Sequence, residues 1–301
     1  MELRRLRYFV MLAEMLHFRQ AAERLHITQP TLSHQIKTLE DEMGTSLFER
    51  VRHKVHLTAA GKIFREHAQR ALKEVEAAAT EISELEGLLQ GNLAIGVFQS
   101  FNSYMLPPLM RKFHAKYPGI HVVTRQLPKR EMEQCILNGE LDLGLAYVPT
   151  MTEKIEAEEL FDESYALIVG KRHPLYGRTR LQISALGRYP LILLTPEFPL
   201  RQVLDASFSL MTTKPQIIME MNSNEAILET VRCTKLATII GSRRPRAIPG
   251  LHCIELDPAI TRTAAIFWRR GGHRSRAALV ISDLIKAAYA QRRGVPSAVA
   301  E

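Results

Sequence analysis

Polar side chains able to read nucleic-acid bases gather between positions 29 and 37 of this sequence. An amide such as Gln29 can form two hydrogen bonds with adenine, and hydroxyl groups can serve bases or phosphates. Leu32, Ile36 and Leu39 recur between the polar positions at helical spacing, which predicts a helix with one buried face. This favours a helix lying in a major groove, although periodicity alone also fits an ordinary solvated helix. The polar positions are Gln29, Thr31, Ser33, His34 and Lys37.

The segments before this helix predict the rest of a helix-turn-helix. Apolar residues at helical spacing indicate a first amphipathic helix around Phe9 and a second over residues 19–26. Thr28 can cap the third helix, Pro30 is tolerated in its first turn, and Gly44 suits its end. Three short helices would therefore hold the polar face in place.

A basic segment follows the third helix. Val51, Val55 and Leu57 have the spacing of a short two-stranded hairpin. Such a hairpin would act as a wing that neutralises phosphates or enters the minor groove, and a merely solvated basic hairpin is the alternative. Its basic residues are Arg50, Arg52, His53 and Lys54.

Composition and charge narrow the function classes. A chain of 301 residues with 46% hydrophobic side chains can bury more than one core, so two or three domains are expected and a disordered protein is excluded. Its apolar stretches fall short of the roughly 20 residues of a membrane helix, and the first residues do not resemble a secretory signal. We therefore expect a cytoplasmic protein with no membrane partner. The net charge of +8 fits a polyanionic partner.

Cysteine usage argues against a disulfide framework and against a structural zinc site. Cys135, Cys233 and Cys253 are an odd number of thiols without a Cys-x-x-Cys spacing. They are expected to be core thiols. We also expect neither a metal nor a cofactor.

A long helix is predicted after the hairpin. No proline interrupts residues 58–89, and apolar residues repeat at alternating spacings of 4 and 3, as in the seam of a coiled coil. The same stripe would fit packing against its own domain, so periodicity favours self-association only slightly. The seam residues are Ala71, Val75, Ala78, Ile82, Leu85 and Leu89.

Beyond Gly91 the pattern changes to short apolar strands that alternate with helices, which predicts an α/β domain. The predicted strands are 93–98, 121–124, 141–147, 165–169, 191–194, 216–221, 238–240 and 264–268. The predicted helices include 104–117, 131–138, 225–233 and 274–292.

The sequence resembles the LysR-type transcriptional regulators over nearly its whole length. Phe9, Ala21-Ala22-Glu23-Arg24-Leu25, Thr28-Gln29-Pro30-Thr31-Leu32-Ser33, Gln35-Ile36, Leu39-Glu40, Gly44, Leu47-Phe48, Arg50 and Leu57-Thr58-Ala59-Ala60-Gly61 carry the resemblance. One departure is Leu16-His17-Phe18-Arg19, where many members have Gly-Ser-Phe-Thr. Because Arg19 cannot cap a helix as threonine would, this departure puts the start of the second helix in doubt.

The resemblance implies that the third helix reads DNA, and the matched positions are Gln29, Pro30, Thr31, Ser33, His34 and Lys37. It also implies a domain order. That order comprises a winged helix-turn-helix over 1–58, a dimerising linker helix over 59–90, an effector-binding domain over 91–293, and a flexible tail over 294–301. The effector domain would resemble periplasmic solute-binding proteins, with one subdomain formed by 92–162 and 267–293 and a second by 163–266. Its landmarks are Gly91-Asn92-Leu93, Asn138-Gly139-Glu140-Leu141-Asp142-Leu143-Gly144 and His173-Pro174-Leu175.

Ligands of such folds bind at the carboxyl ends of strands, where helix N-termini favour anions. We therefore expect a small anionic effector, with Arg201 as a fork for its carboxylate. Ordinary helix capping is the alternative for the polar residues, and core packing is the alternative for the aromatic ones. The candidates are Gln99, Ser100, Phe101, Asn102, Ser103, Tyr147, Thr195, Phe198, Arg201 and Asn222. Phe101-Asn102-Ser103-Tyr104 and Glu197-Phe198 also resemble the cyanate-operon regulator subgroup, which does not identify the ligand.

The resemblance implies a transcription factor that binds double-stranded promoter DNA sequence-specifically as a homodimer or homotetramer, with RNA polymerase as a further partner. Two other classes compete with this function. An enzyme is disfavoured because the chain has no Gly-x-Gly-x-x-Gly, phosphate-loop, Gly-x-Ser-x-Gly or His-Glu-x-x-His motif, and no catalytic residue is assigned. An architectural protein that binds DNA regardless of sequence would be equally basic, but would have no need of a sensor domain.

Overall fold

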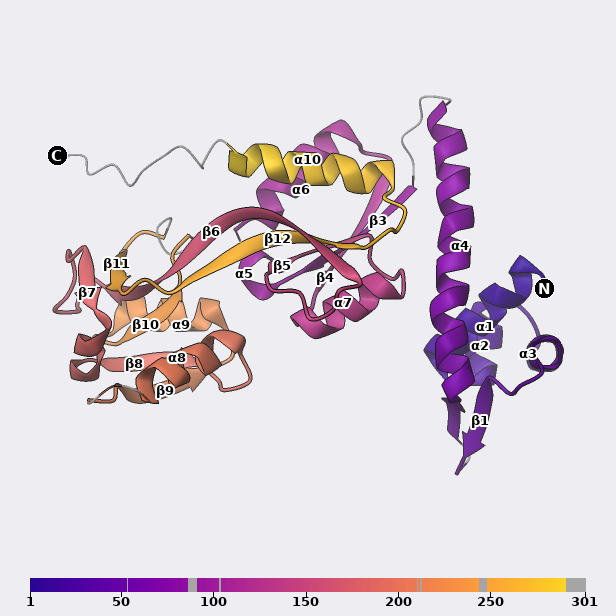
Figure 1. Cartoon of the computed structure of the whole chain (residues 1–301), viewed down its shortest axis with the longest axis horizontal. Helices are drawn as coiled ribbons and strands as arrows, with labels where there is room; N and C mark the ends of the chain where they lie inside the picture. The colour runs from indigo at the N-terminus through magenta and orange to yellow at the C-terminus, as the bar shows by residue number, and fades with distance from the viewer. Residues whose placement is uncertain are drawn as a thin grey trace. The chain divides into compact units, whose positions relative to one another are not determined.

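The computed structural model describes residues 1–52, 54–85, 91–102, 104–209, 211, 213–243 and 248–290 (Figure 1). Contacts divide these residues into two compact units. Unit 1 contains residues 1–99, 106–158 and 266–290, and unit 2 contains residues 100–105 and 159–265. The architecture is the expected N-terminal winged helix-turn-helix followed by an α/β domain.

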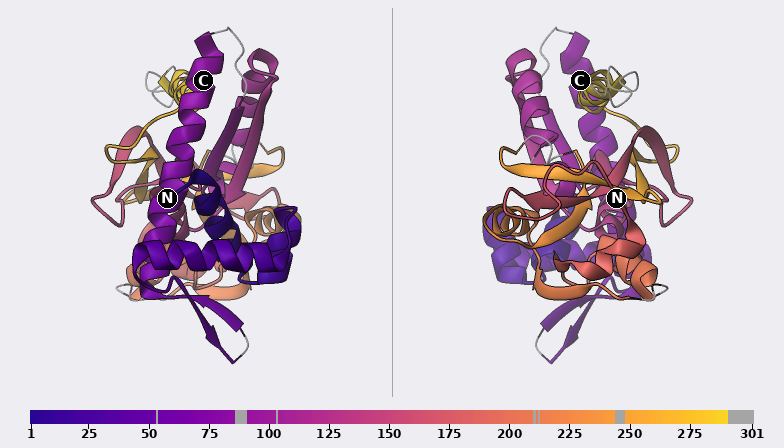
Figure 2. Two further views of the ribbon diagram at one scale, coloured as in Figure 1. Left: turned by 90° about the vertical axis from the view of Figure 1, so that its right-hand side faces the viewer. Right: turned by 90° about the vertical axis from the view of Figure 1, so that its left-hand side faces the viewer.

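The N-terminal module is built from three helices and a hairpin. They are α1 (Leu3–Met15), α2 (Phe18–Arg24), α3 (Gln29–Met43), β1 (Phe48–Val51) and β2 (Lys54–Leu57). Phe9 is fully buried, with its ring 5.2 Å from that of Phe48 and 4.8 Å from that of Phe64. The antiparallel hairpin projects beyond the helices of its module, as a wing does (Figure 2).

Helix α4 (Ala59–Leu85) follows the wing, as the proline-free stretch predicts. The seam positions Ala71, Val75, Ala78 and Ile82 are exposed in the single chain, with Ile82 64% accessible. The side chain of Leu85 and the whole of Leu89 lie outside the described residues. An exposed apolar stripe argues against packing of this face on its own domain.

Unit 1 continues with a parallel sheet and its covering helices. Its remaining elements are β3 (Gly91–Val97), α6 (Leu106–Lys116), β4 (Ile120–Gln126), α7 (Lys129–Leu137), β5 (Leu143–Tyr147) and α10 (Arg276–Ala290). β3 pairs in parallel with β4 and with β5. Helix α7 packs closely on the sheet, because a Cβ at Gly144 would lie 2.6 Å from Sδ of Met132.

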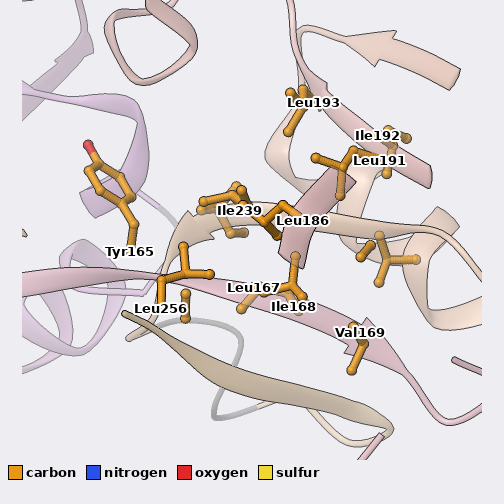
Figure 3. Packing of buried hydrophobic residues seen from close by; sticks show 14 of the residues in the cluster. Tyr165, Leu167, Ile168, Val169, Leu186, Leu191, Ile192, Leu193, Ile239 and Leu256 are labelled. Carbon is orange, nitrogen blue, oxygen red and sulfur yellow. The ribbon is translucent and has the colours of Figure 1, made fainter. Parts of the chain in front are cut away.

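Unit 2 surrounds a second core. It contains α5 (Gln99–Asn102, from Ser100 onward), β7 (Arg180–Gln182), a 3-10 helix (Ile183–Arg188), β8 (Pro190–Leu194), α8 (Pro199–Ser209), β9 (Gln216–Met221), α9 (Asn224–Cys233), β10 (Ala237–Gly241) and β11 (Leu251–Asp257). Its core joins Leu167, Ile168 and Val169 to residues of β8 and β10, such as Leu191 and Ile239 (Figure 3).

Two strands belong to both units. The boundary falls within β6 (Ile155–Gly170), after Glu158, and within β12 (Thr261–Arg269), after Ala265. The strand order is β4-β3-β5-β12-β6-β10-β8-β9, with β11 beside β6 and β7 beside β11. These are the crossover strands that the family resemblance implies.

Several predicted elements differ in extent from the observed ones, and two of the differences are informative. The helix expected over 104–117 begins at Leu106, because Pro107 and Pro108 lack the amide hydrogens of a helix interior and suit a first turn. The strand expected over 165–169 begins ten residues earlier, at Ile155, in sequence rich in glutamate.

Candidate functional site

Helix α3 is positioned by a cap at each end and by its buried face. The hydroxyl of Thr28 accepts a hydrogen bond from the Thr31 backbone N–H at 3.4 Å, and Gly44 ends the helix in the left-handed conformation at φ +66°. Leu32, Ile36 and Leu39 are buried. The opposite face is therefore turned outward, as the sequence predicts.

The outward face carries every polar position proposed for DNA contact on this helix. Gln29, Pro30, Thr31, His34 and Lys37 are exposed, and Ser33 is half-buried. Nε2 of Gln29 donates to Oγ of Ser33 at 2.8 Å. The hydroxyls of Thr28 and Thr31 lie 2.8 Å apart. The side chains of the first turn are thus ordered before any ligand binds.

Glu40 ties the wing to α3. It belongs to the Leu39-Glu40 pair that carries the family resemblance, but the sequence indicated no role for it. Oε1 of Glu40 accepts from the backbone N–H groups of Leu47 at 2.7 Å and Phe48 at 3.0 Å. A groove of about 710 Å³ lies between α3 and the wing, with Ser33 and Lys37 in its lining.

The tip of the wing carries the proposed phosphate contacts. Val51 pairs with Lys54 across the turn, and Arg52 and Lys54 are exposed. The side chain of Arg50 and all of His53 lie outside the described residues. Two of the four predicted basic groups can therefore be placed, and both face water.

The second helix starts through a cap that sequence reasoning missed. Nδ1 of His17 accepts from the Gln20 N–H at 3.4 Å, so α2 begins at Phe18 despite the missing threonine. Arg19 instead pairs with Glu23 at 3.0 Å, one helical turn away. A histidine before a helix is a weak sequence signal, because its cap needs an unprotonated nitrogen.

A second missed group of residues holds α1 against α3. Nε of Arg5 donates to Oε1 of Gln35 at 3.1 Å, and its guanidinium pairs with Glu42. Because Gln35 and Glu42 lie 30 and 37 residues after Arg5, no local pattern in the sequence could pair them with it.

In unit 1, two proposed effector residues meet at one edge of the sheet. Tyr147 ends β5 and Gln99 follows β3, and these strands run parallel with Val97 opposite Leu145. Tyr147 is buried and packs edge-on against Phe98, with the ring centroids 5.7 Å apart. Nearby, buried Glu133 accepts from the Met151 N–H at 2.8 Å and so fixes the loop after β5. Burial raises the pKa of Glu133.

In unit 2, Thr195 and Asn222 meet in the same way. β8 and β9 run parallel with Leu194 opposite Met221, and the Thr195 N–H donates to the Met221 carbonyl at 3.2 Å. α8 and α9 begin just beyond, and Phe198 lies half-buried against the core at the start of α8. The proposed residues of this unit therefore gather at the carboxyl edge of its parallel strands, where ligands of α/β folds bind.

Residues 100–102, at the start of unit 2, differ in how far their side chains are buried. Phe101 is buried, and its ring lies 6.5 Å from that of Phe161, so core packing accounts for it. Ser100 is half-buried and Asn102 is exposed, while Ser103 lies outside the described residues. Ser100 and Asn102 therefore remain candidates for effector binding in this segment.

Arg201 requires a correction. Its side chain is buried, with Nε donating to Asp205 at 2.8 Å and Nη1 donating to Glu220 at 2.5 Å and to the Leu194 carbonyl at 2.9 Å. The guanidinium thus ties α8 to β8 and β9. These bonds use three of the five N–H donors. A two-bond fork would need Nη2 together with Nε or Nη1, so it would have to break one of these bonds.

The cysteines are all among the described residues, and none of them forms a disulfide. Cys233 is exposed, so the expectation of a core thiol is wrong there, because α9 turns this position outward at its last residue. Burial, with Glu140 adding to it, raises the pKa of Cys135 to about 11, which keeps this thiol protonated and unreactive.

The described residues hold no group of three or more side chains that could bind a metal ion. Within the same part of the chain, no helix is long and apolar enough to cross a bilayer.

Two family models match the chain, one over the N-terminal module and one over the α/β domain. The family described as "LysR substrate binding domain" matches residues 86–290, and "Bacterial regulatory helix-turn-helix protein, lysR family" matches residues 3–62. The RuBisCO operon transcriptional regulator of Allochromatium vinosum is 32% identical over 85% of this chain and 81% of its own length.

Two further similarities were found. The regulator AlsR of Bacillus subtilis is 36% identical over 65% of this chain, and the chain likewise spans 65% of AlsR. The solved structure of a full-length OxyR variant from Pseudomonas aeruginosa superposes with a TM-score of 0.76, at 29% identity over 95% of both chains.

Proposed function

Because the chain belongs to the LysR family of bacterial regulators, we propose that it controls its target promoter as a homodimer or homotetramer in response to a small anion. It is a DNA-binding transcriptional regulator with an effector-binding domain. The observation that carries the proposal is the ordered polar first turn of α3 beside a basic wing. A helix of this kind reads base edges, while the wing neutralises phosphates.

Dimerisation through α4 is supported by the exposed seam of Val75 and Ile82. Two copies of α3 placed about one duplex turn apart would read a two-fold site more tightly than one copy. Contacts between effector domains would extend the dimer to a tetramer, and RNA polymerase would be the partner at the promoter. A protein that acts on the chromosome would work in the cytoplasm, and we assign it no catalytic reaction.

An anionic effector is supported by the N-termini of α8 and α9 at the carboxyl edge of β8 and β9. Unsatisfied N–H groups and the helix dipole favour negative charge there. Thr195 and Asn222 would supply hydrogen bonds to the anion at this edge.

A footprint on the DNA upstream of the protein's own gene, with random DNA as competitor, tests this function. We expect discrete protection over several helical turns. Uniform protection that random DNA abolishes would instead favour the architectural alternative. Protection that appears only when another promoter is offered would support regulation of a different target.

A further inference from the structure

The inference concerns what determines the base that Gln29 prefers, and it rests on the proposed function because it requires α3 in a major groove. Ser33 lies four residues after Gln29 on the same face of α3. Its Oγ accepts a hydrogen bond from Nε2 of Gln29 at 2.8 Å. Gln29 is exposed, so this contact restrains a side chain that would otherwise rotate freely in water.

The contact decides which groups Gln29 has left to offer. A glutamine amide carries two N–H donors and one carbonyl acceptor. With one donor used by Ser33, Gln29 retains one N–H donor and the acceptor Oε1. Adenine presents the matching pair in the major groove, an acceptor at N7 and a donor at N6, whereas guanine presents two acceptors.

The neighbouring hydroxyls are engaged elsewhere. Thr31 is bonded to Thr28 at 2.8 Å, and the hydroxyl of Thr38 donates to the His34 carbonyl at 2.9 Å. Ser33 is thus the hydroxyl placed to hold the Gln29 amide. Without it, the amide can turn over and present two N–H groups to guanine.

We propose that Ser33 is a positioning residue that makes Gln29 selective for adenine by accepting one of its amide hydrogens. Ser33 acts through Gln29 rather than by reading a base itself. Its loss should therefore change the preference at the base pair that Gln29 faces by a larger factor than it changes the affinity for random DNA.

The test begins with the full-length wild-type protein and a library of randomised duplexes, which yields the preferred site. Gln29→Ala then identifies the base pair that loses discrimination, by a factor of about 10 to 100. Affinities of Ser33→Ala, Ser33→Thr and the double variant are measured on the four versions of that pair and on random DNA. Thermal unfolding checks that each variant is folded.

We expect Ser33→Ala to lose about tenfold of the adenine preference at that same pair, with part of the loss appearing as better binding to guanine. Ser33→Thr, which keeps the hydroxyl, should retain the preference. The double variant should discriminate no worse than Gln29→Ala alone. Thr38→Ala is the matched control, because it removes a hydroxyl of the same helix that does not touch Gln29.

Three outcomes would overturn the inference. Ser33→Ala could weaken all duplexes equally, as a phosphate contact would. It could relax a different base pair, or its effect could add to that of Gln29→Ala in the double variant. Failure of the wild type to select any site would instead overturn the proposed function, and it would be seen before a variant is made.

Discussion

Leu16 ends α1 in a left-handed backbone conformation, at φ 49° and ψ 26°, where glycine is the usual residue. A side chain with a Cβ is strained there by roughly 1 to 2 kcal/mol. The Leu16 side chain is exposed, so little packing would be lost on its removal. After the greater chain entropy of unfolded glycine is subtracted, we expect Leu16→Gly to raise the free energy of unfolding by roughly 0.5 kcal/mol.

Thermal unfolding of the N-terminal module would measure this gain. Leu16→Ala is the matched control, since it removes the same exposed atoms but keeps the Cβ. Equal stability of the glycine and alanine variants would show that backbone strain at this position has no effect.

His173 gives unit 2 a dependence on pH. Its ring is buried, Nδ1 accepts from the Leu175 N–H at 3.1 Å, and Nε2 has no hydrogen-bond partner among the described residues. Burial lowers the pKa of His173 in the folded protein, so the unfolded chain takes up its proton first. The part of the free energy of unfolding that depends on unprotonated His173 should therefore be fully present above about pH 6.5, and it should decrease as the pH falls below that value.

Urea unfolding across this range would show a slope of at most about 1.4 kcal/mol per pH unit from this group. His173→Gln is expected to reduce the slope, because glutamine does not titrate. The comparison cancels the other titrating groups. An identical slope in both proteins would remove His173 as the cause.

Among the elements, those with simple periodicity could be predicted from sequence, and those stabilised by distant partners could not. α3 was predicted by its caps and apolar spacing. The first ten residues of β6 were missed because their glutamates suggest a loop, whereas one of them, the buried Glu163, pairs with Arg262 of β12 at 2.6 Å. The predicted fork at Arg201 failed for the same reason, because Glu220 lies in a strand beyond the reach of local patterns.

The exposed seam of α4 leads to a prediction about assembly. Ile82 is 64% accessible in the single chain, and burying such a side chain stabilises by about 1.5 to 3 kcal/mol. Ile82→Glu should therefore raise the dimer dissociation constant at least about tenfold. Sedimentation equilibrium would measure it. Lys62→Glu is the control, because the helical repeat places exposed Lys62 nearly opposite Ile82, and an equal effect of both changes would contradict the seam.

At the scale of the whole molecule, regulation requires an effector that binds two arrangements of the units with different affinity. Strands β6 and β12 cross the boundary between the units, as does the chain at residues 99–100 and 105–106. The chain's single tryptophan, Trp268, lies on β12 close to that boundary. Its Nε1 donates to Oε2 of Glu158, the last residue before the boundary in β6, at 3.3 Å. The guanidinium of Arg274 lies 4.6 Å from the ring centroid.

Because indole emission responds to nearby charge, we expect effector binding to change the fluorescence of Trp268. The titration would use inorganic phosphate and short mono- and dicarboxylates, with binding followed in parallel by calorimetry. Trp268→Phe should bind with the same affinity but without the optical change. Heat of binding from a ligand that leaves the emission of the wild type unaltered would mean that occupancy does not reach the crossover strands, and the units would then have to be coupled to α4 and the DNA by another route.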